Sequence, residues 1–139
     1  MATIQQNTAH EKVTAKALAG AQGTLSLKNL TGKWNCCDKN TRNIVQVVLG
    51  TKGNALTVQV FGACSPSPCD WGVVEGIAYG DSVTATDAIA FSARYDFNFK
   101  ETIVTGLLDN GTLIVETYNK FKDASGRSNY YSRSYFCRS

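Results

Sequence analysis

Short runs of β-branched and aromatic residues, separated by turn residues, follow one another from position 32 to the end of the chain. No stretch keeps the 3.6-residue period of an amphipathic helix, whereas runs of this length bounded by Gly, Asn, Asp or Ser are typical of antiparallel strands. The pattern predicts eight strands, at residues 32–37, 44–50, 55–62, 71–79, 88–95, 101–108, 112–121 and 128–137. Turn sequences such as Asp109-Asn110-Gly111 connect them.

Alternation within these strands suggests how they pack. Leu56, Val58 and Val60 share one face of their strand, while the opposite face is mixed, and other strands carry mixed faces too. Eight antiparallel strands can close on themselves, which removes exposed edges and encloses side chains or one small ligand. The predicted fold is therefore all-β, an eight-stranded antiparallel up-and-down barrel, with a two-sheet sandwich as the alternative.

The first part of the chain differs in composition. After Met1, the bulky aliphatic residues up to position 23 are Ile4, Val13 and Leu18, too few for a core-facing stripe. We predict a flexible tail at 1–29 and a barrel domain at 30–139. This segment lacks the apolar run of a secretory signal. The compartment therefore stays open, and secretion is the expectation if the cysteines are bridged.

The length and charge of the chain limit the classes of partner that it is expected to bind. A chain of 139 residues is one ordinary domain, and its longest apolar runs are far shorter than the roughly 20 residues of a membrane-spanning helix. The net charge of +3 comes without a run of basic residues. We therefore expect neither nucleic acid nor membrane as a partner.

The segment Leu30-Thr31-Gly32-Lys33-Trp34 resembles the start of the first strand in avidin-like barrels, and its Gly-x-Trp resembles the opening of the wider calycin group, which includes lipocalins. This resemblance implies that Trp34 closes one end of a barrel and that a basic residue near the chain end packs across it. Arg138 follows the last predicted strand. The resemblance thus assigns structural roles to Trp34 and Arg138, with a cation-π contact between them.

The same resemblance bears on the ligand. Avidins hold biotin with a polar cluster near the first strands, where Asn35 lies here, and with several tryptophans. This chain has two tryptophans and offers Tyr95, Tyr118 and Phe121 in the later strands instead. The resemblance therefore implies the fold but not biotin.

Five cysteines suggest disulfides. Cys64 and Cys69 bracket a loop with two prolines, and we predict a local disulfide between them. Cys137 can reach Cys36 or Cys37 if the first and last strands are neighbours, which leaves one cysteine over. A zinc site would need Cys36 and Cys37 together, but adjacent strand residues point to opposite faces. We expect no metal and no cofactor.

Candidate chemistry is sparse. The single histidine, His10, lies in the predicted tail, so histidine-based catalysis is not expected. Glu75 shares a face with Trp71 by alternation, and an interior Glu75 would need a partner such as Arg94 or Arg133.

The leading hypothesis is a non-enzymatic binding protein that takes a small ligand or a glycan at the barrel mouth or loops. The candidate ligand-binding residues are Asn35, Trp71, Glu75, Tyr95, Tyr118 and Asn119. A small barrel enzyme of the isomerase or cyclase type, which shapes a reactive substrate with Glu75, Tyr or Arg side chains, is one alternative. A self-associating lectin or defence protein, forming a homo-oligomer, is the other.

Overall fold

The computed structural model describes residues 25–139, and all of its regular structure is β-strand. The strands are β1 (Gly32–Cys36), β2 (Ile44–Lys52), β3 (Ala55–Gly62), β4 (Cys69–Tyr79), β5 (Ala90–Asp96), β6 (Lys100–Asp109), β7 (Thr112–Phe121) and β8 (Tyr130–Arg138). The eight predicted strands are confirmed, with ends that differ by three residues or fewer. In the described part of the chain, no helix is long and apolar enough to cross a membrane.

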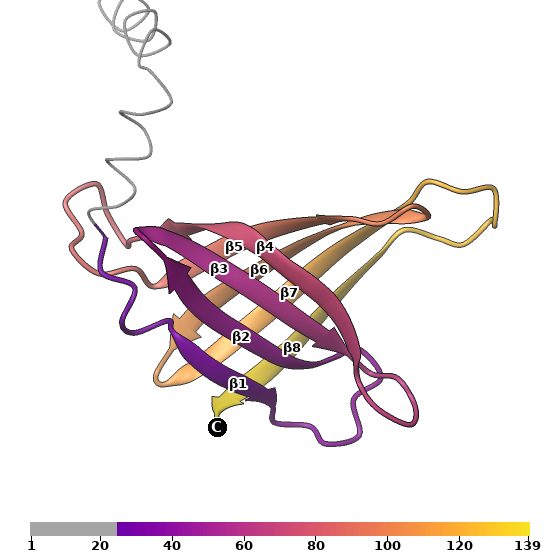
Figure 1. Ribbon diagram of the computed structural model, residues 1–139, viewed down its shortest axis with the longest axis horizontal. Helices are drawn as coiled ribbons and strands as arrows, with labels where there is room; N and C mark the ends of the chain where they lie inside the picture. The colour runs from indigo at the N-terminus through magenta and orange to yellow at the C-terminus, as the bar shows by residue number, and fades with distance from the viewer. Residues whose placement is uncertain (1–24) are drawn as a thin grey trace, which may run out of the picture.

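Each strand pairs antiparallel with the next one along the chain, and β8 returns to pair with β1. The sheet therefore closes into an up-and-down barrel, as predicted, and the two-sheet sandwich is wrong. In Figure 1 the front strands β1–β4 cross the back strands β6–β8 at an angle, because strands in a closed barrel tilt relative to its axis. The closing seam pairs Trp34 with Arg138 and Cys36 with Phe136.

The barrel interior is filled over much of its length by apolar side chains. Alternate residues of every strand point inward, so β3 presents Leu56, Val58 and Val60, all buried, to the core. The largest fully buried side chains are Trp34, Phe91 and Phe136. These side chains form a packed hydrophobic core inside the barrel.

One end of the barrel, which we call the closed end, holds the start of β1, the β2–β3 and β6–β7 hairpins and the residues that precede β1. Leu30 is fully buried there, and Leu25 and Leu27 pack against the core. Ser26 forms a bridge to Asp87. Residues 25–29, which the sequence placed in the tail, therefore contact the barrel, while 1–24 lie outside the described residues and the tail stays a prediction for them.

The predicted contact between Trp34 and Arg138 is confirmed. The guanidinium carbon lies 4.3 Å from the centre of the Trp34 ring. Its two terminal nitrogens donate to the carbonyls of Thr31 and Asn29, each at 2.6 Å, and Trp34 Nε1 donates to the Leu30 carbonyl at 2.8 Å. These bonds tie the chain before β1 across the closed end.

The opposite end, the open end, carries the connections 37–43, 63–68, 97–99 and 122–129, which lie toward the right in Figure 1. The Cys64–Cys69 disulfide lies there, whereas the Cys37–Cys137 disulfide lies beside the β1–β8 seam. Cys64–Cys69 confirms the predicted local bridge, and Cys37–Cys137 joins the chain after β1 to β8. Cys36 is the cysteine left free.

Candidate functional site

A pocket of about 200 Å³ opens at the open end, above the packed core. We call it the open-end pocket. Its lining comes from both sides of the barrel mouth and includes the disulfide-bridged loop: Arg42, Asn43, Ile44, Gly62, Ala63, Cys64, Cys69, Trp71, Lys100, Thr117, Asn119, Tyr130 and Ser132. Concave sites with a few polar groups among apolar walls are the usual form of small-molecule sites.

A β-bulge in β4 places Trp71 in this pocket. The β3–β4 register steps from Gln59 opposite Val73 to Phe61 opposite Asp70, so β4 has one residue more than its partner at this point. Gly72 adopts φ +92°, which residues with a side chain rarely adopt. Because the bulge shifts the alternation by one residue, Trp71 lies on the inner side of the sheet.

The same bulge corrects the predicted position of Glu75. Alternation placed Glu75 on one face with Trp71, but the structure places it with Val73, Ile77 and Tyr79 on the exposed outer face of β4. Trp71 and Glu75 are therefore on opposite faces. The enzyme hypothesis that required Glu75 inside the barrel fails for this reason.

Tyr95 on β5 packs against Trp71 inside the barrel. The two rings meet edge to face with centres 5.5 Å apart, and the buried Tyr95 hydroxyl lies 2.8 Å from the Gly72 carbonyl and 3.1 Å from the Val58 carbonyl. The Tyr95 hydroxyl thus hydrogen-bonds the Gly72 carbonyl, which belongs to the bulge itself. Burial raises the pKa of Tyr95 to about 12, because ionisation would place a charge in the core.

Gly62 on β3 leaves space for the Trp71 indole. A Cβ at this position would lie 2.8 Å from Trp71 Nε1, closer than real contacts allow. Trp71 lines the pocket, and its Nε1 has no hydrogen-bond acceptor among residues 25–139 and is not one of the buried nitrogens. The indole N–H is therefore a donor free for a ligand.

Three buried polar residues, Thr102, Thr117 and Asn119, form the inner polar wall of the barrel mouth. Asn119 is at their centre: its Oδ1 accepts from Thr102 Oγ1 at 2.8 Å, and its Nδ2 donates to Thr117 Oγ1 at 3.0 Å. Thr117 also hydrogen-bonds Ser132. In the described chain, every buried side-chain N or O atom has a hydrogen-bond partner, so this wall is preformed.

Lys100, at the start of β6, brings a positive charge into the pocket. Its Nζ donates to Asn119 Oδ1 at 3.2 Å and lies 5.3 Å from the centre of the Trp71 ring. The rings of Phe97, Phe99 and Tyr130 lie within 6.0 Å of the same nitrogen. Partial burial, and secondarily the charge of Arg127, lower the pKa of Lys100.

The rim around Lys100 is aromatic and cationic. Arg127 lies over Phe121 at 4.3 Å and pairs with Asp123 at 2.9 Å. Arg42, an exposed side chain, lines the other side of the mouth. Within residues 25–139, no Asp or Glu lines the open-end pocket, so its side chains carry positive charge only.

The six predicted ligand-binding residues divide evenly between the two surfaces of the barrel. Trp71, Tyr95 and Asn119 lie together at the open end, inside the barrel. The other three lie outside: Asn35 accepts a hydrogen bond from Gln46 Nε2 at 2.9 Å, Glu75 is exposed, and Tyr118 packs against Tyr131. A ligand contact by any of the six stays a prediction.

Sequence reasoning did not single out Lys100, Thr102 or Thr117. Alternation along β6 carries the signal, because Lys100 and Thr102 share a face with the buried Val104 and Gly106. Thr117 and Asn119 likewise continue the buried face of Leu113 and Val115. Polar residues that extend an apolar face toward a strand end are the pattern that could have identified them.

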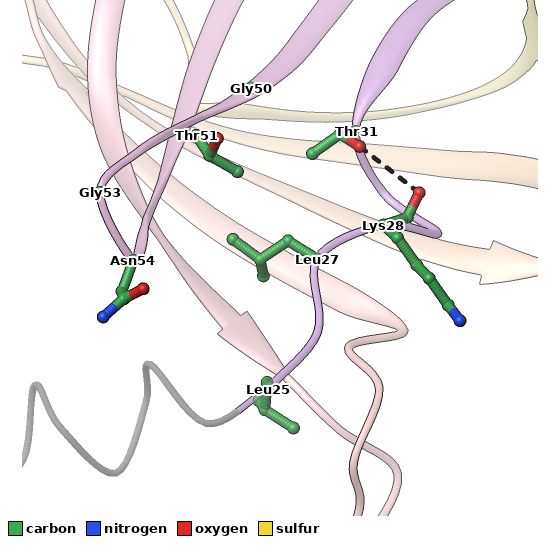
Figure 2. Close-up of a pocket in the computed structure, with 8 residues that line it drawn as sticks. All are labelled: Leu25, Leu27, Lys28, Thr31, Gly50, Thr51, Gly53 and Asn54. Atoms are coloured by element: carbon green, nitrogen blue, oxygen red, sulfur yellow. Dashed lines mark hydrogen bonds between the residues drawn. The ribbon is translucent and has the colours of Figure 1, made fainter.

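A second pocket, of about 360 Å³, lies at the closed end (Figure 2). It is formed where Leu25, Leu27, Lys28 and Thr31 meet the β2–β3 hairpin, and the Leu27 side chain points toward that hairpin. Its one dashed hydrogen bond joins Thr31 Oγ1 to the Lys28 carbonyl at 3.4 Å, within the same turn. Because no buried polar wall backs this pocket, the open-end pocket is the stronger candidate.

In the described residues, no three His, Cys, Asp or Glu side chains gather in a group that could hold a metal ion. Comparison with models of known protein families, with curated proteins and with solved structures finds no match to this chain. The candidate function accordingly rests on the chain's own residues.

Proposed function

We propose that this protein is a non-enzymatic binding protein that takes one small molecule in the open-end pocket. A single observation carries the proposal: the preformed polar wall centred on Asn119 and the Trp71 indole, whose N–H has no acceptor among residues 25–139, line the same pocket of about 200 Å³. Interiors normally fill such spaces with side chains. A gap lined by an aromatic ring and satisfied polar groups is typical of a ligand site.

The avidin-like resemblance supports this proposal through architecture. The chain closes eight strands in an up-and-down order and opens at one end, as that resemblance implies. Its tryptophans do not favour biotin, because Trp34 hydrogen-bonds Leu30 near the closed end while Trp71 lines the open end. Two tryptophans so placed cannot enclose one ligand.

A thermal-shift screen tests the proposal. We expect one chemical class among small aromatic acids, neutral aromatics, biotin and simple sugars to stabilise the protein. A ligand at 100 times its dissociation constant adds about 2.7 kcal/mol to the unfolding free energy, which corresponds to a shift of several degrees for a domain of this size.

A blocking variant shows whether a stabilising ligand uses the open-end pocket. Ala63 lines the pocket, so Ala63→Phe should fill it and abolish the shift. Ala124, exposed in the 122–129 connection and outside the pocket lining, provides the matched control Ala124→Phe. A shift that survives Ala63→Phe, or a screen without any shift, contradicts the proposal.

A glycan on the outer face of β7–β8 is a second candidate, favoured by an exposed aromatic pair. Tyr118 and Tyr131 are half exposed, with ring centres 5.3 Å apart, and they border a depression that includes Lys120 and Asn129. Exposed aromatic rings beside polar groups suit stacking on a sugar ring. Loss of binding on a glycan array in Tyr131→Ala, but not in Ala63→Phe, would favour this candidate over the open-end pocket.

The two disulfides support a compartment in which disulfides persist. Secretion or another oxidising location is therefore part of the proposal. Mass spectrometry of the native protein under alkylating conditions tests it, and five alkylated cysteines would contradict it.

A further inference from the structure

Three side chains of the open-end pocket, Arg42, Trp71 and Lys100, carry N–H groups that can only donate hydrogen bonds. Trp71 Nε1 and the Arg42 guanidinium have no acceptor among residues 25–139. The Lys100 ammonium carries three N–H groups, and one acceptor in the described chain, Asn119 Oδ1, serves it. The main acceptor of the polar wall, Asn119 Oδ1, is already shared with Thr102. A ligand that complements these three side chains must therefore bring acceptors.

The charge of Lys100 likewise favours a ligand that brings acceptors, and in particular a negative charge. Its Nζ is partly buried among aromatic rings, and none of the ion pairs within residues 25–139 includes it. A partly desolvated cation is costly unless it is paired, and aromatic faces compensate in part. Asp123, the carboxylate of the 122–129 connection, is engaged by Arg127. The pocket thus holds a cation without its counter-charge.

We propose that the open-end pocket selects small carboxylates, with the ligand's carboxylate at Lys100 Nζ and its apolar body against Trp71. This inference rests on the proposed function and adds the chemical class of the ligand. The carboxylate supplies two acceptor oxygens to the ammonium and to the free indole N–H. An apolar body fits the pocket wall formed by the Trp71 ring, Ala63 and Ile44.

The titration of Lys100 agrees with this geometry. Burial and the nearby Arg127 lower its pKa, and Arg42 is the other cation of the mouth. A bound anion opposes both effects, because it stabilises the charged form of the amine.

An NMR titration with two matched probes tests the ligand class. Phenylacetate and phenylacetamide have the same shape and differ in charge. The protein has two tryptophans, so it gives two indole N–H resonances, one from each end of the barrel. Trp71→Phe assigns them, and the Trp34 resonance is an internal control. We expect phenylacetate to move the Trp71 resonance with an affinity at least about tenfold above that of phenylacetamide.

Variants of two lysines decide whether Lys100 is responsible. Lys100→Met removes the charge and keeps the length of the side chain, and we expect it to reduce phenylacetate affinity about tenfold or more while phenylacetamide is unaffected. Lys120→Met is the control, because Lys120 is exposed and lies outside the pocket lining. Thermal unfolding of each variant verifies that it is folded.

The outcomes separate the two proposals. Equal affinity for the two probes, or an unchanged preference in Lys100→Met, overturns the carboxylate inference and leaves the binding function standing. If phenylacetate moves only the Trp34 resonance, or neither resonance, the carboxylate inference fails. Failure of the thermal-shift screen as well overturns the proposed function.

Discussion

At the scale of single residues, the open-end pocket depends on groups that hold one another in place. The Trp71 ring rests on Tyr95, and the Tyr95 hydroxyl lies within hydrogen-bond distance of the bulge carbonyl at Gly72. Removing the hydroxyl leaves that carbonyl without its partner while the ring remains. Tyr95 is therefore a positioning residue, whose contribution is measurable as stability.

Tyr95→Phe should weaken the fold at neutral pH and change its response to alkali. Loss of the hydroxyl costs about 1 kcal/mol. The pKa of Tyr95 is about 12, raised above its ordinary value of 10.0, so between these values the unfolded chain loses a proton that the folded chain keeps. Stability from this group is therefore present below about pH 10 and is lost as the pH rises toward 12. Urea unfolding near pH 8 and near pH 11 should show a smaller alkaline loss in Tyr95→Phe.

The exposed Tyr135 provides the control for this experiment. Tyr135→Phe should retain the alkaline loss of the wild type. An identical pH dependence in Tyr95→Phe and the wild type would contradict the burial of an intact hydroxyl.

At the scale of elements, close approach between strands shapes the core. β5 and β6 are neighbours, and Gly106 lies opposite Phe91 in their register. A Cβ at position 106 would lie 2.0 Å from a ring carbon of Phe91. Because Gly106 has no side chain, β6 leaves the space in which the fully buried Phe91 ring lies.

Gly106→Ala should therefore destabilise the barrel by about 1–3 kcal/mol through overpacking. A smaller side chain at position 91 relieves the clash, so Gly106→Ala combined with Phe91→Leu should cost less than the sum of the single changes. Urea unfolding of the four proteins in this cycle measures the coupling. Additive costs would show that the two positions do not contact each other.

At the scale of the whole molecule, closure of the sheet is reinforced covalently. The Cys37–Cys137 disulfide spans 100 residues and lies beside the β1–β8 seam, whereas Cys64–Cys69 spans 5. A crosslink restricts the unfolded chain more when its loop is longer. The two bridges should therefore contribute differently to stability.

In a Cys36→Ser background, which removes the free thiol, we expect Cys37→Ser with Cys137→Ser to lower the unfolding free energy by as much as about 4–5 kcal/mol. Cys64→Ser with Cys69→Ser should lower it by about 2 kcal/mol on the same loop-entropy argument. Chemical denaturation of both variants measures the difference. Equal losses would contradict a loop-length origin.

Self-association of the barrel stays a prediction, and sedimentation of the wild type tests it.

The sequence by itself determined the eight strands and their antiparallel order, because period-2 alternation and turn residues are local properties. It favoured a barrel over a two-sheet sandwich, and the β1–β8 pairing decided between them. It also determined the Cys64–Cys69 bridge, whose partners are close along the chain, and the resemblance at Trp34 indicated the contact with Arg138.

Only the tertiary structure decided which residues face the open-end pocket. Strict alternation assigned Trp71 and Glu75 to one face, but the bulge at Gly72 separates them. A bulge depends on the register between two strands, and one strand's pattern does not contain that register. Lys100 and Asn119 likewise become neighbours of Trp71 because the sheet closes and brings β6 and β7 opposite β4. The local pattern therefore determined the strands, and their long-range pairing determined the closure of the barrel and the site.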